Sequence, residues 1–203
     1  MPADEHYRTV TTAGTAKIAN RGSRFIGTIT GVESVEMAED WIEKWYDTHP
    51  EATHIVPAYR IRSTPFREWS SDAGEPHGSA GKPILSVLQG EELEDVVAVV
   101  IRYYGGTNLG IGGLVRSYST VIREAIDNAT VETRVPHVTG TIETPYDDSG
   151  TVRSILESAD VLTDATYDET VTFCIDVPTD SVETIDDRVL SATGGRIHVK
   201  WRE

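Results

Sequence analysis

The chain has 203 residues, enough for one large or two small domains with a substantial core. Its net charge of −15 comes with only four lysines among 18 basic residues. This composition indicates a halophilic protein that stays soluble at high salt, and an ordinary acidic cytosolic protein is the alternative. No apolar run approaches the roughly 18 residues that span a bilayer, and the first residues lack a signal-peptide pattern. Because Cys174 is the only cysteine, an intramolecular disulfide is excluded, and we predict a cytoplasmic protein without a membrane partner.

The N-terminal part of the chain is predicted to form paired strands followed by a helix. β-Branched residues in 9–15 and 28–30 favour strands that pair around a turn or bulge at Gly22. Residues 34–49 carry apolar side chains at helical spacing, with Ser34 as the expected N-cap.

The next part of the chain alternates between strand-like and irregular patterns. Residues 53–63 alternate in polarity and predict a strand. Residues 64–82 are too rich in Gly, Pro and Ser for regular structure and are predicted to form a long loop. A short helix is expected to begin at Pro83, which suits the first helical position. The apolar run 96–101 predicts a buried strand.

Two glycine-dense segments, 71–83 and 102–116, flank this buried strand. The second leaves the strand through glycines and enters an amphipathic helix, so it is expected to expose backbone N–H groups at the positive end of a helix dipole. Such a turn fits an anion such as phosphate. The alternative is that the glycines only permit a tight turn and close helix contact, because neither standard phosphate-binding pattern is present. We assign anion or nucleic-acid binding to Lys82, Arg102, Tyr104, Gly105, Gly106, Gly110, Gly112, Gly113 and Arg116.

The basic and aromatic residues of this set could have structural roles instead of binding a ligand. Arginine offers a planar fork for phosphate, but the same cations can instead pair with Asp72, Glu75 or Glu124. Tyr103 and Tyr104 alternate at the strand end, so one is expected in the core and the other at the surface, where it can stack on a base.

The acidic residues of the first glycine segment, with two histidines, form a second candidate site. Asp72, Glu75, His54 and His77 together offer ligand types for a divalent metal or an acid–base pair. No zinc-motif spacing and no Gly-x-Ser-x-Gly elbow accompanies them, and the alternative is that the carboxylates cap turns. We therefore predict no catalytic residue, no metal and no cofactor, and an inert Cys174 in a strand.

The C-terminal part follows a linker at 130–137 and has a β-α-β-β-α-β pattern. This order predicts a ferredoxin-like module, with other small α+β sandwiches as the alternative. The expected elements cover 138–144, 147–159, 161–167, 170–177, 181–193 and 196–202.

In combination, these motifs resemble the IMPACT/YigZ family over nearly the whole chain. The resemblance is carried by Ser23-Arg24-Phe25, by His54 ahead of Ala58-Tyr59-Arg60, and by segments 72–83 and 102–118. Two positions depart from the family pattern, since Ala73 replaces a usual acidic residue and Asn108 replaces a common lysine. The family-motif positions are His54, Asp72, Gly74, Glu75, Gly78 and Gly81.

The resemblance implies a two-domain α+β fold. Residues 1–134 are expected to form an N-terminal α/β sandwich, similar to the second domain of a small-subunit ribosomal protein and to domain IV of elongation factor G. Residues 135–203 are expected to form a ferredoxin-like domain similar to domain V of that factor. Eukaryotic members restrain a starvation-responsive kinase through an extra N-terminal module that this sequence does not show, so kinase regulation is not implied.

The leading functional hypothesis is a non-enzymatic, translation-associated regulator that binds RNA or the ribosome through the glycine- and arginine-rich cleft. One alternative is an enzyme acting on a small phosphorylated or carboxylated metabolite in the same cleft. Another is a stress-response interaction module with a protein partner in translation control. The net charge of −15 opposes nucleic-acid binding, although high salt screens both the repulsion and the attraction.

Overall fold

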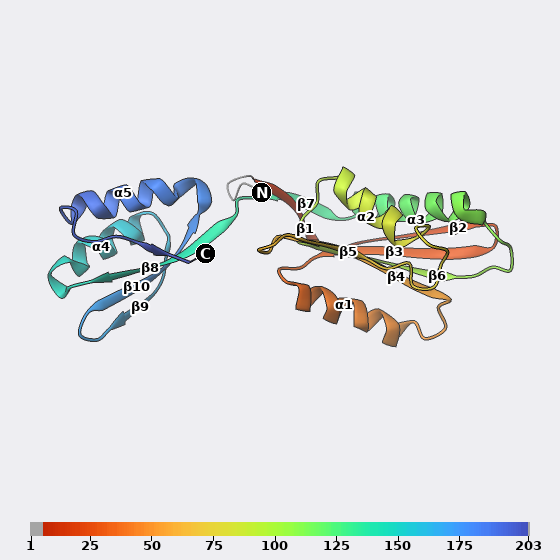
Figure 1. Cartoon of the computed structure of the whole chain (residues 1–203), viewed down its shortest axis with the longest axis horizontal. Helices are drawn as coiled ribbons and strands as arrows, with labels where there is room; N and C mark the ends of the chain where they lie inside the picture. The colour runs from red at the N-terminus through yellow and green to blue at the C-terminus, as the bar shows by residue number, and fades with distance from the viewer. Residues whose placement is uncertain (1–5, 203) are drawn as a thin grey trace. The chain divides into compact units, whose positions relative to one another are not determined.

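The computed structural model describes residues 6–202, which form two compact units of mixed α/β structure (Figure 1). One unit spans Tyr7–Arg134, and the other runs from Val135 to the end of the described chain. Each unit has its own hydrophobic core. Across the described residues, no helix has the length and apolar character needed to cross a membrane.

The N-terminal unit is built on a five-stranded antiparallel sheet in the order β2-β3-β6-β4-β5. Helices α2 and α3 lie on one face of this sheet and α1 lies on the other (Figure 1). Strands β1 and β7 pair separately as an antiparallel ribbon. The elements are β1 (Tyr7–Thr12), β2 (Gly14–Asn20), β3 (Ser23–Gly31), α1 (Val35–Thr48), β4 (His54–Ile61), β5 (Arg67–Ser70), α2 (Gly81–Gly90), β6 (Val96–Tyr103), α3 (Gly110–Asp127) and β7 (Thr130–Arg134).

The central strand β6 is apolar on both faces because helices cover both faces of the sheet. Val97, Val99 and Ile101 lie in the cluster beneath α1, whereas Ala98 and Val100 lie in the cluster beneath α2 and α3. A continuous apolar run is what a strand buried on two sides requires. Each buried valine or isoleucine of this strand stabilises the fold by about 1.5–3 kcal/mol.

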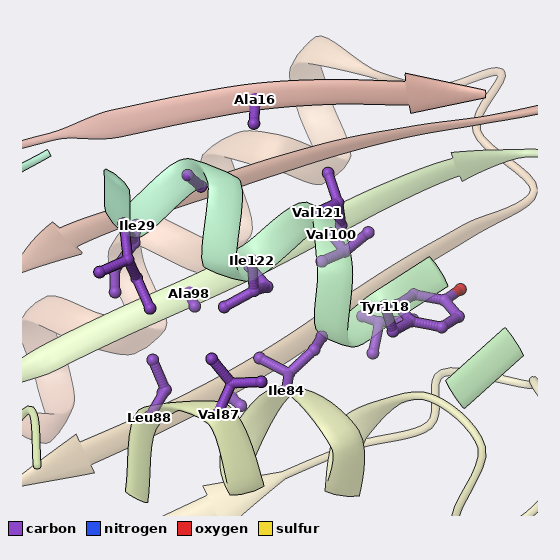
Figure 2. Close-up of a cluster of buried hydrophobic side chains, with 14 of the residues drawn as sticks. Ala16, Ile29, Ile84, Val87, Leu88, Ala98, Val100, Tyr118, Val121 and Ile122 are labelled. Carbon is purple, nitrogen blue, oxygen red and sulfur yellow. The ribbon is translucent and has the colours of Figure 1, made fainter. Parts of the chain in front are cut away.

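Helix α3 lies unusually close to the sheet. Figure 2 shows Tyr118, Val121 and Ile122 of this helix among the buried side chains of the core. A Cβ atom at Gly27 of β3 would lie 2.9 Å from the Val121 carbonyl oxygen, so the strand needs glycine where the helix crosses it. Close helix contact is therefore one real use of the chain's glycines.

Two predicted boundaries around the first glycine segment were wrong. The predicted loop 64–82 contains strand β5, in which Trp69 pairs with Tyr59 and stacks on it at 5.4 Å between ring centroids. Helix α2 begins at Gly81 rather than at Pro83. In both cases the element depends on a partner six to twelve residues earlier, β4 for β5 and Asp72 for α2, and hydrophobic periodicity does not report such pairing.

The predicted linker at 130–137 and the predicted last strand also need correction. The linker contains β7, which is ordered by pairing with β1. The last strand, β11, covers only Lys200–Trp201, because the N–H of Ile197 bonds to Thr193 Oγ1 and the N–H of Val199 bonds to Asp186 Oδ1. The backbone N–H groups that a longer β11 would use for strand pairing are therefore bonded to side-chain oxygens.

The C-terminal unit has the order β-α-β-β-α-β and a four-stranded antiparallel sheet arranged β11-β8-β10-β9. This is the element order of ferredoxin-like domains. Both α-helices lie on one face of the sheet (Figure 1) and enclose an apolar core around Phe173 and Ile175. The elements are β8 (His137–Thr144), α4 (Tyr146–Ser158), β9 (Leu162–Tyr167), β10 (Val171–Pro178), a 3₁₀ turn (Thr179–Ser181), α5 (Val182–Ala192) and β11.

Candidate functional site

The two glycine-dense segments meet at one end of the N-terminal sheet. There Arg102 of β6 is paired in register with Phe25 of β3 and His54 of β4. The loop that follows β5 brings Glu75 against Arg102, and α3 brings Tyr118. Glu75, Arg102, Tyr118, His54 and Ser23 form what we call the Glu75 cluster.

The centre of the Glu75 cluster is a buried ion pair. Glu75 Oε1 accepts hydrogen bonds from Arg102 Nη1 and, at 2.7 Å, from the Tyr118 hydroxyl. The side chains of Arg102 and Glu75 are only 5% and 3% exposed. Burial, and the adjacent Glu75 carboxylate, raise the pKa of Tyr118, which stays protonated as a donor. Arg102 is therefore paired with Glu75, the alternative that the sequence left open, and is not presented to an external anion.

His54 and Ser23 complete the cluster without forming a catalytic pair. His54 Nδ1 is 2.9 Å from the Ala73 carbonyl oxygen, which can only accept, so Nδ1 carries a proton. Its Nε2 lies 3.8 Å from Glu75 Oε2, and both ring nitrogens are thus directed at the protein. Ser23 Oγ accepts from Arg102 Nη2 at 3.3 Å and from the Gly105 N–H at 3.1 Å. These contacts position the loops around the Glu75 cluster.

The acidic loop binds its own backbone. Asp72 accepts hydrogen bonds from the N–H groups of Gly78, Ala80 and Gly81 at 2.7, 3.1 and 2.9 Å. Partial burial by itself would raise the pKa of Asp72, but these three bonds together outweigh it, so the pKa is lowered and the carboxylate stays charged. The N-terminus of α2 is thus occupied by an internal anion.

The described part of the chain has no group of side chains placed to bind a metal ion together. No three His, Cys, Asp or Glu side chains among residues 6–202 come together as ligands. His77 Nδ1 lies 3.7 Å from Asp72 Oδ2, but the His77 side chain is fully exposed and the Asp72 carboxylate is committed to backbone donors.

The N-terminus of α3 differs from that of α2 because no side chain caps it. Helix α3 begins at Gly110, has Leu109 at the N-cap, and has no acidic residue in its first turn. Among described residues, no hydrogen-bond acceptor meets the N–H groups of Gly106 and Gly110. We call residues 105–113, with Tyr104 and Arg116, the α3 mouth.

The glycines of the α3 mouth divide into two groups. A Cβ atom at Gly105 would collide with the backbone of Gly22 at 1.9 Å, and one at Gly113 would lie 3.0 Å from Leu109 Cβ, so these two serve close contact. Gly106 and Gly110 have φ of +82° and +69°, and a Cβ atom at either would have no neighbour within 4 Å, which leaves their backbone open. At Gly112 the neighbour is Arg116 Nη1 at 3.5 Å, so this guanidinium lies along the first turn of the helix.

The remaining predicted site residues lie at the α3 mouth, at the start of α2 or in the acidic loop. Tyr104 is 45% exposed and donates to Asn108 Oδ1 at 3.1 Å, whereas Tyr103 packs against the α1 cluster, as the alternation predicted. Lys82 is exposed in the first turn of α2, the helix end that Asp72 occupies. Gly74 and Gly78 have positive φ in the acidic loop, and a Cβ atom at Gly81 would lie 2.5 Å from the Ser71 carbonyl oxygen.

The family motifs include Ser23 and Tyr118, but no binding or catalytic role was predicted for them or for Thr53. Ser23 and Thr53 accept the N–H groups of Gly105 and Tyr104, and thereby hold the start of the glycine turn. The role of Tyr118 could have been predicted, because a tyrosine on the apolar face of a predicted helix needs a buried hydrogen-bond partner for its hydroxyl.

Comparisons with known proteins agree with the two-part organisation. Residues 21–126 match the Impact N-terminal domain, and residues 142–196 match a domain of unknown function, DUF1949. IMPACT family member YvyE of Bacillus subtilis is 34% identical over 97% of this chain and 91% of its own length. IMPACT family member YigZ of Escherichia coli is 35% identical over 68% of this chain and 69% of its own length. A crystal structure described as a hypothetical protein is 28% identical, with a TM-score of 0.77 over 98% of both chains. The chain therefore belongs to the IMPACT/YigZ family.

Proposed function

We propose that this protein is a translation-associated regulator that binds RNA or the ribosome through the α3 mouth, without catalysis. Family membership supports a place in translation, because the resemblance to this family implies domains similar to parts of a ribosomal protein and of elongation factor G. That likeness is an analogy of fold, so the proposal of binding rests on the residues of the site. A protein partner in translation control fits the same role.

The observation that carries the proposal is the uncapped, glycine-lined N-terminus of α3. The end of a helix of this length carries roughly half a positive charge, and its free N–H groups point at whatever lies beyond it. Arg116 lies along the same turn and offers a guanidinium fork for a phosphate. Tyr104 beside it presents a half-exposed ring on which a base can stack.

The contrast with α2 sharpens this proposal. At α2 the Asp72 carboxylate accepts the N–H groups of Ala80 and Gly81, so an external anion would meet occupied donors and a like charge. At α3 no acidic side chain stands in the first turn. A phosphate is therefore expected at α3 and not at α2.

The test is a titration of the isotope-labelled protein with inorganic phosphate and then with transfer RNA. Amide resonances of Gly106, Gly110 and Gly112 are expected to shift, and Arg116→Ala is expected to weaken RNA binding about tenfold, as one lost phosphate contact implies. Arg123→Ala, an exposed arginine further along α3, is the matched control and is expected to bind as the parent does. Equal RNA affinity of parent and Arg116→Ala contradicts the proposal.

The same donors also fit a small phosphorylated or carboxylated metabolite, which is the second candidate. A thermal-shift comparison separates the two, because a ligand that binds only the folded state raises the melting temperature. Stabilisation by a metabolite with none by RNA favours the metabolite. Arg102→Ala is unsuitable for either test, since it leaves Glu75 buried and unpaired.

A further inference from the structure

Part of the N-terminal sheet is left uncovered on the α1 side. Helix α1 contacts β4 and β6, whereas β2 and β3 extend beyond it. Along β3, Phe25 and Ile29 point into the core beneath α3, so the alternating residues Arg24 and Ile26 face the α1 side. Lys17 of β2 is paired with Ile26 and faces the same way.

The flank of α1 next to these strands carries apolar side chains and one lysine. Ala38 and Ile42 face the sheet, and the Tyr46 hydroxyl bonds to the Ile55 carbonyl oxygen of β4, which fixes the rotation of the helix. At about 100° per residue, Met37, Trp41 and Lys44 then fall on the flank toward β3. Glu39 and Glu43 fall on the opposite flank with Tyr46.

A line of aromatic rings connects this flank to the sheet. The ring centroids of Trp41 and Trp45 are 5.4 Å apart, and Trp45 stacks on His49 at 5.6 Å. His49 Nδ1 lies 2.7 Å from the Tyr103 hydroxyl, and the Arg24 guanidinium carbon lies 4.9 Å from the centre of the Tyr103 ring. The line therefore ends at a cation on β3.

Three cations near this surface have no ion-pair partner in the described part of the chain, although Asp40 and Asp47 lie within one helical turn of Lys44. Lys17, Arg24 and Lys44 make no ion pair with any residue in 6–202, although the whole chain has a net charge of −15. A hollow of about 300 Å³ lies over the two strands. Lys17, Arg24 and Ile26, which face the α1 side, line it together with Ala19 and with Ile18 and Phe25, which face α3. We call Lys17, Arg24, Ile26, Trp41, Lys44 and Tyr103 the β2–β3 face.

We propose that the β2–β3 face binds single-stranded RNA, as a second site separate from the α3 mouth. Unpaired bases expose flat faces that stack on aromatic rings, and cations without an ion pair, among them Arg24 over the Tyr103 ring, can contact a phosphate backbone. A duplex keeps its bases stacked on one another, so a single strand fits this surface. The choice of RNA over DNA rests on the proposed function in translation.

The experiment measures binding of a fluorescent uridine RNA of about ten nucleotides to the full chain at low salt. Lys17→Glu/Arg24→Glu is expected to weaken binding at least tenfold, and to lower the slope of log affinity against log salt by about 0.7 for each lost contact. Arg67→Glu/Arg123→Glu makes the same change in charge at exposed arginines outside the face and is expected to bind nearly as the parent does. Equal loss in both pairs would show a nonspecific charge effect and overturn the proposal.

A second readout comes from the tryptophans. With Trp69 and Trp201 replaced by phenylalanine, the remaining emission comes from Trp41 and Trp45, and RNA is expected to quench it. Unchanged emission at saturating RNA overturns the proposal, as does equal affinity for thymidine DNA or preference for an acidic peptide. Amide shifts at the α3 mouth on phosphate addition report the other site separately, so failure of one proposal is distinguishable from failure of the other.

Discussion

A single carboxylate, that of Glu75, connects three parts of the N-terminal unit. It bonds Arg102 on the central strand and Tyr118 on α3 while belonging to the acidic loop. Two charges buried together are tolerated because each neutralises the other, and removing either one leaves an isolated charge in a medium of low polarity. The Glu75 cluster is therefore a structural support beneath the α3 mouth.

Glu75→Gln is expected to lower the free energy of unfolding by about 3–5 kcal/mol, because Arg102 stays buried without a counter-charge. Denaturant unfolding followed by circular dichroism measures the change. Glu157→Gln, which breaks the exposed Arg153–Glu157 pair, is the control and is expected to show no measurable change. If the two variants lose the same stability, the buried pair is not a support.

Asp95 offers a pH-dependent prediction at the same scale. Burial raises its pKa above the ordinary 3.8, so the native state disfavours the charged form and the stability of the parent falls as the pH rises through the folded pKa. Asparagine keeps an acceptor for the Arg62 N–H and tolerates the φ of +53° found at this position. Asp95→Asn is expected to raise the free energy of unfolding near neutral pH.

That gain is expected to shrink as the pH falls toward 3.8, where the parent carboxyl becomes neutral as well. Urea unfolding of both proteins across this pH range measures the difference. A gain that does not change with pH would show that the carboxylate charge is not its cause.

At the scale of elements, the two helices on one face of the sheet have different N-termini. Helix α2 is capped by Asp72 from nine residues upstream of Gly81, whereas α3 begins with glycines and no cap. An uncapped helix end forgoes roughly 0.5–2 kcal/mol of stability, and it keeps its N–H groups free for a ligand.

Gly112→Ala separates these two effects in α3. Alanine has the higher helix propensity, and its Cβ would meet only Arg116 Nη1 at an ordinary 3.5 Å, so the free energy of unfolding is expected to rise by up to about 1 kcal/mol. The added methyl group stands over the first turn, so phosphate binding is expected to weaken. Thermal unfolding and a phosphate titration check the two halves, and unchanged phosphate binding would argue against an anion at this turn.

At the scale of the whole molecule, charge is uneven. The chain has a net charge of −15, and yet Arg24 lies over the Tyr103 ring and Arg116 lies along the glycine-rich first turn of α3. Because repulsion between a polyanion and the rest of the surface acts over about a Debye length, high salt reduces it more than it reduces contacts at short range. Acidic composition and local anion binding are thus compatible in one protein.

Helix α1, the central strand and the C-terminal element order could be predicted from the amino-acid sequence, because hydrophobic periodicity and capping residues are local signals. The family could be predicted for the same reason, since its motifs are contiguous in the chain. Strand β5, the start of α2, the pairing of Arg102 with Glu75 and the cationic β2–β3 face were decided only by tertiary structure. The Arg102–Glu75 pair and the Arg24–Tyr103 contact join residues far apart in sequence, whereas β5 and the start of α2 depend on pairing across six to twelve residues that no hydrophobic periodicity reports; all of these contacts exist only once the chain has folded.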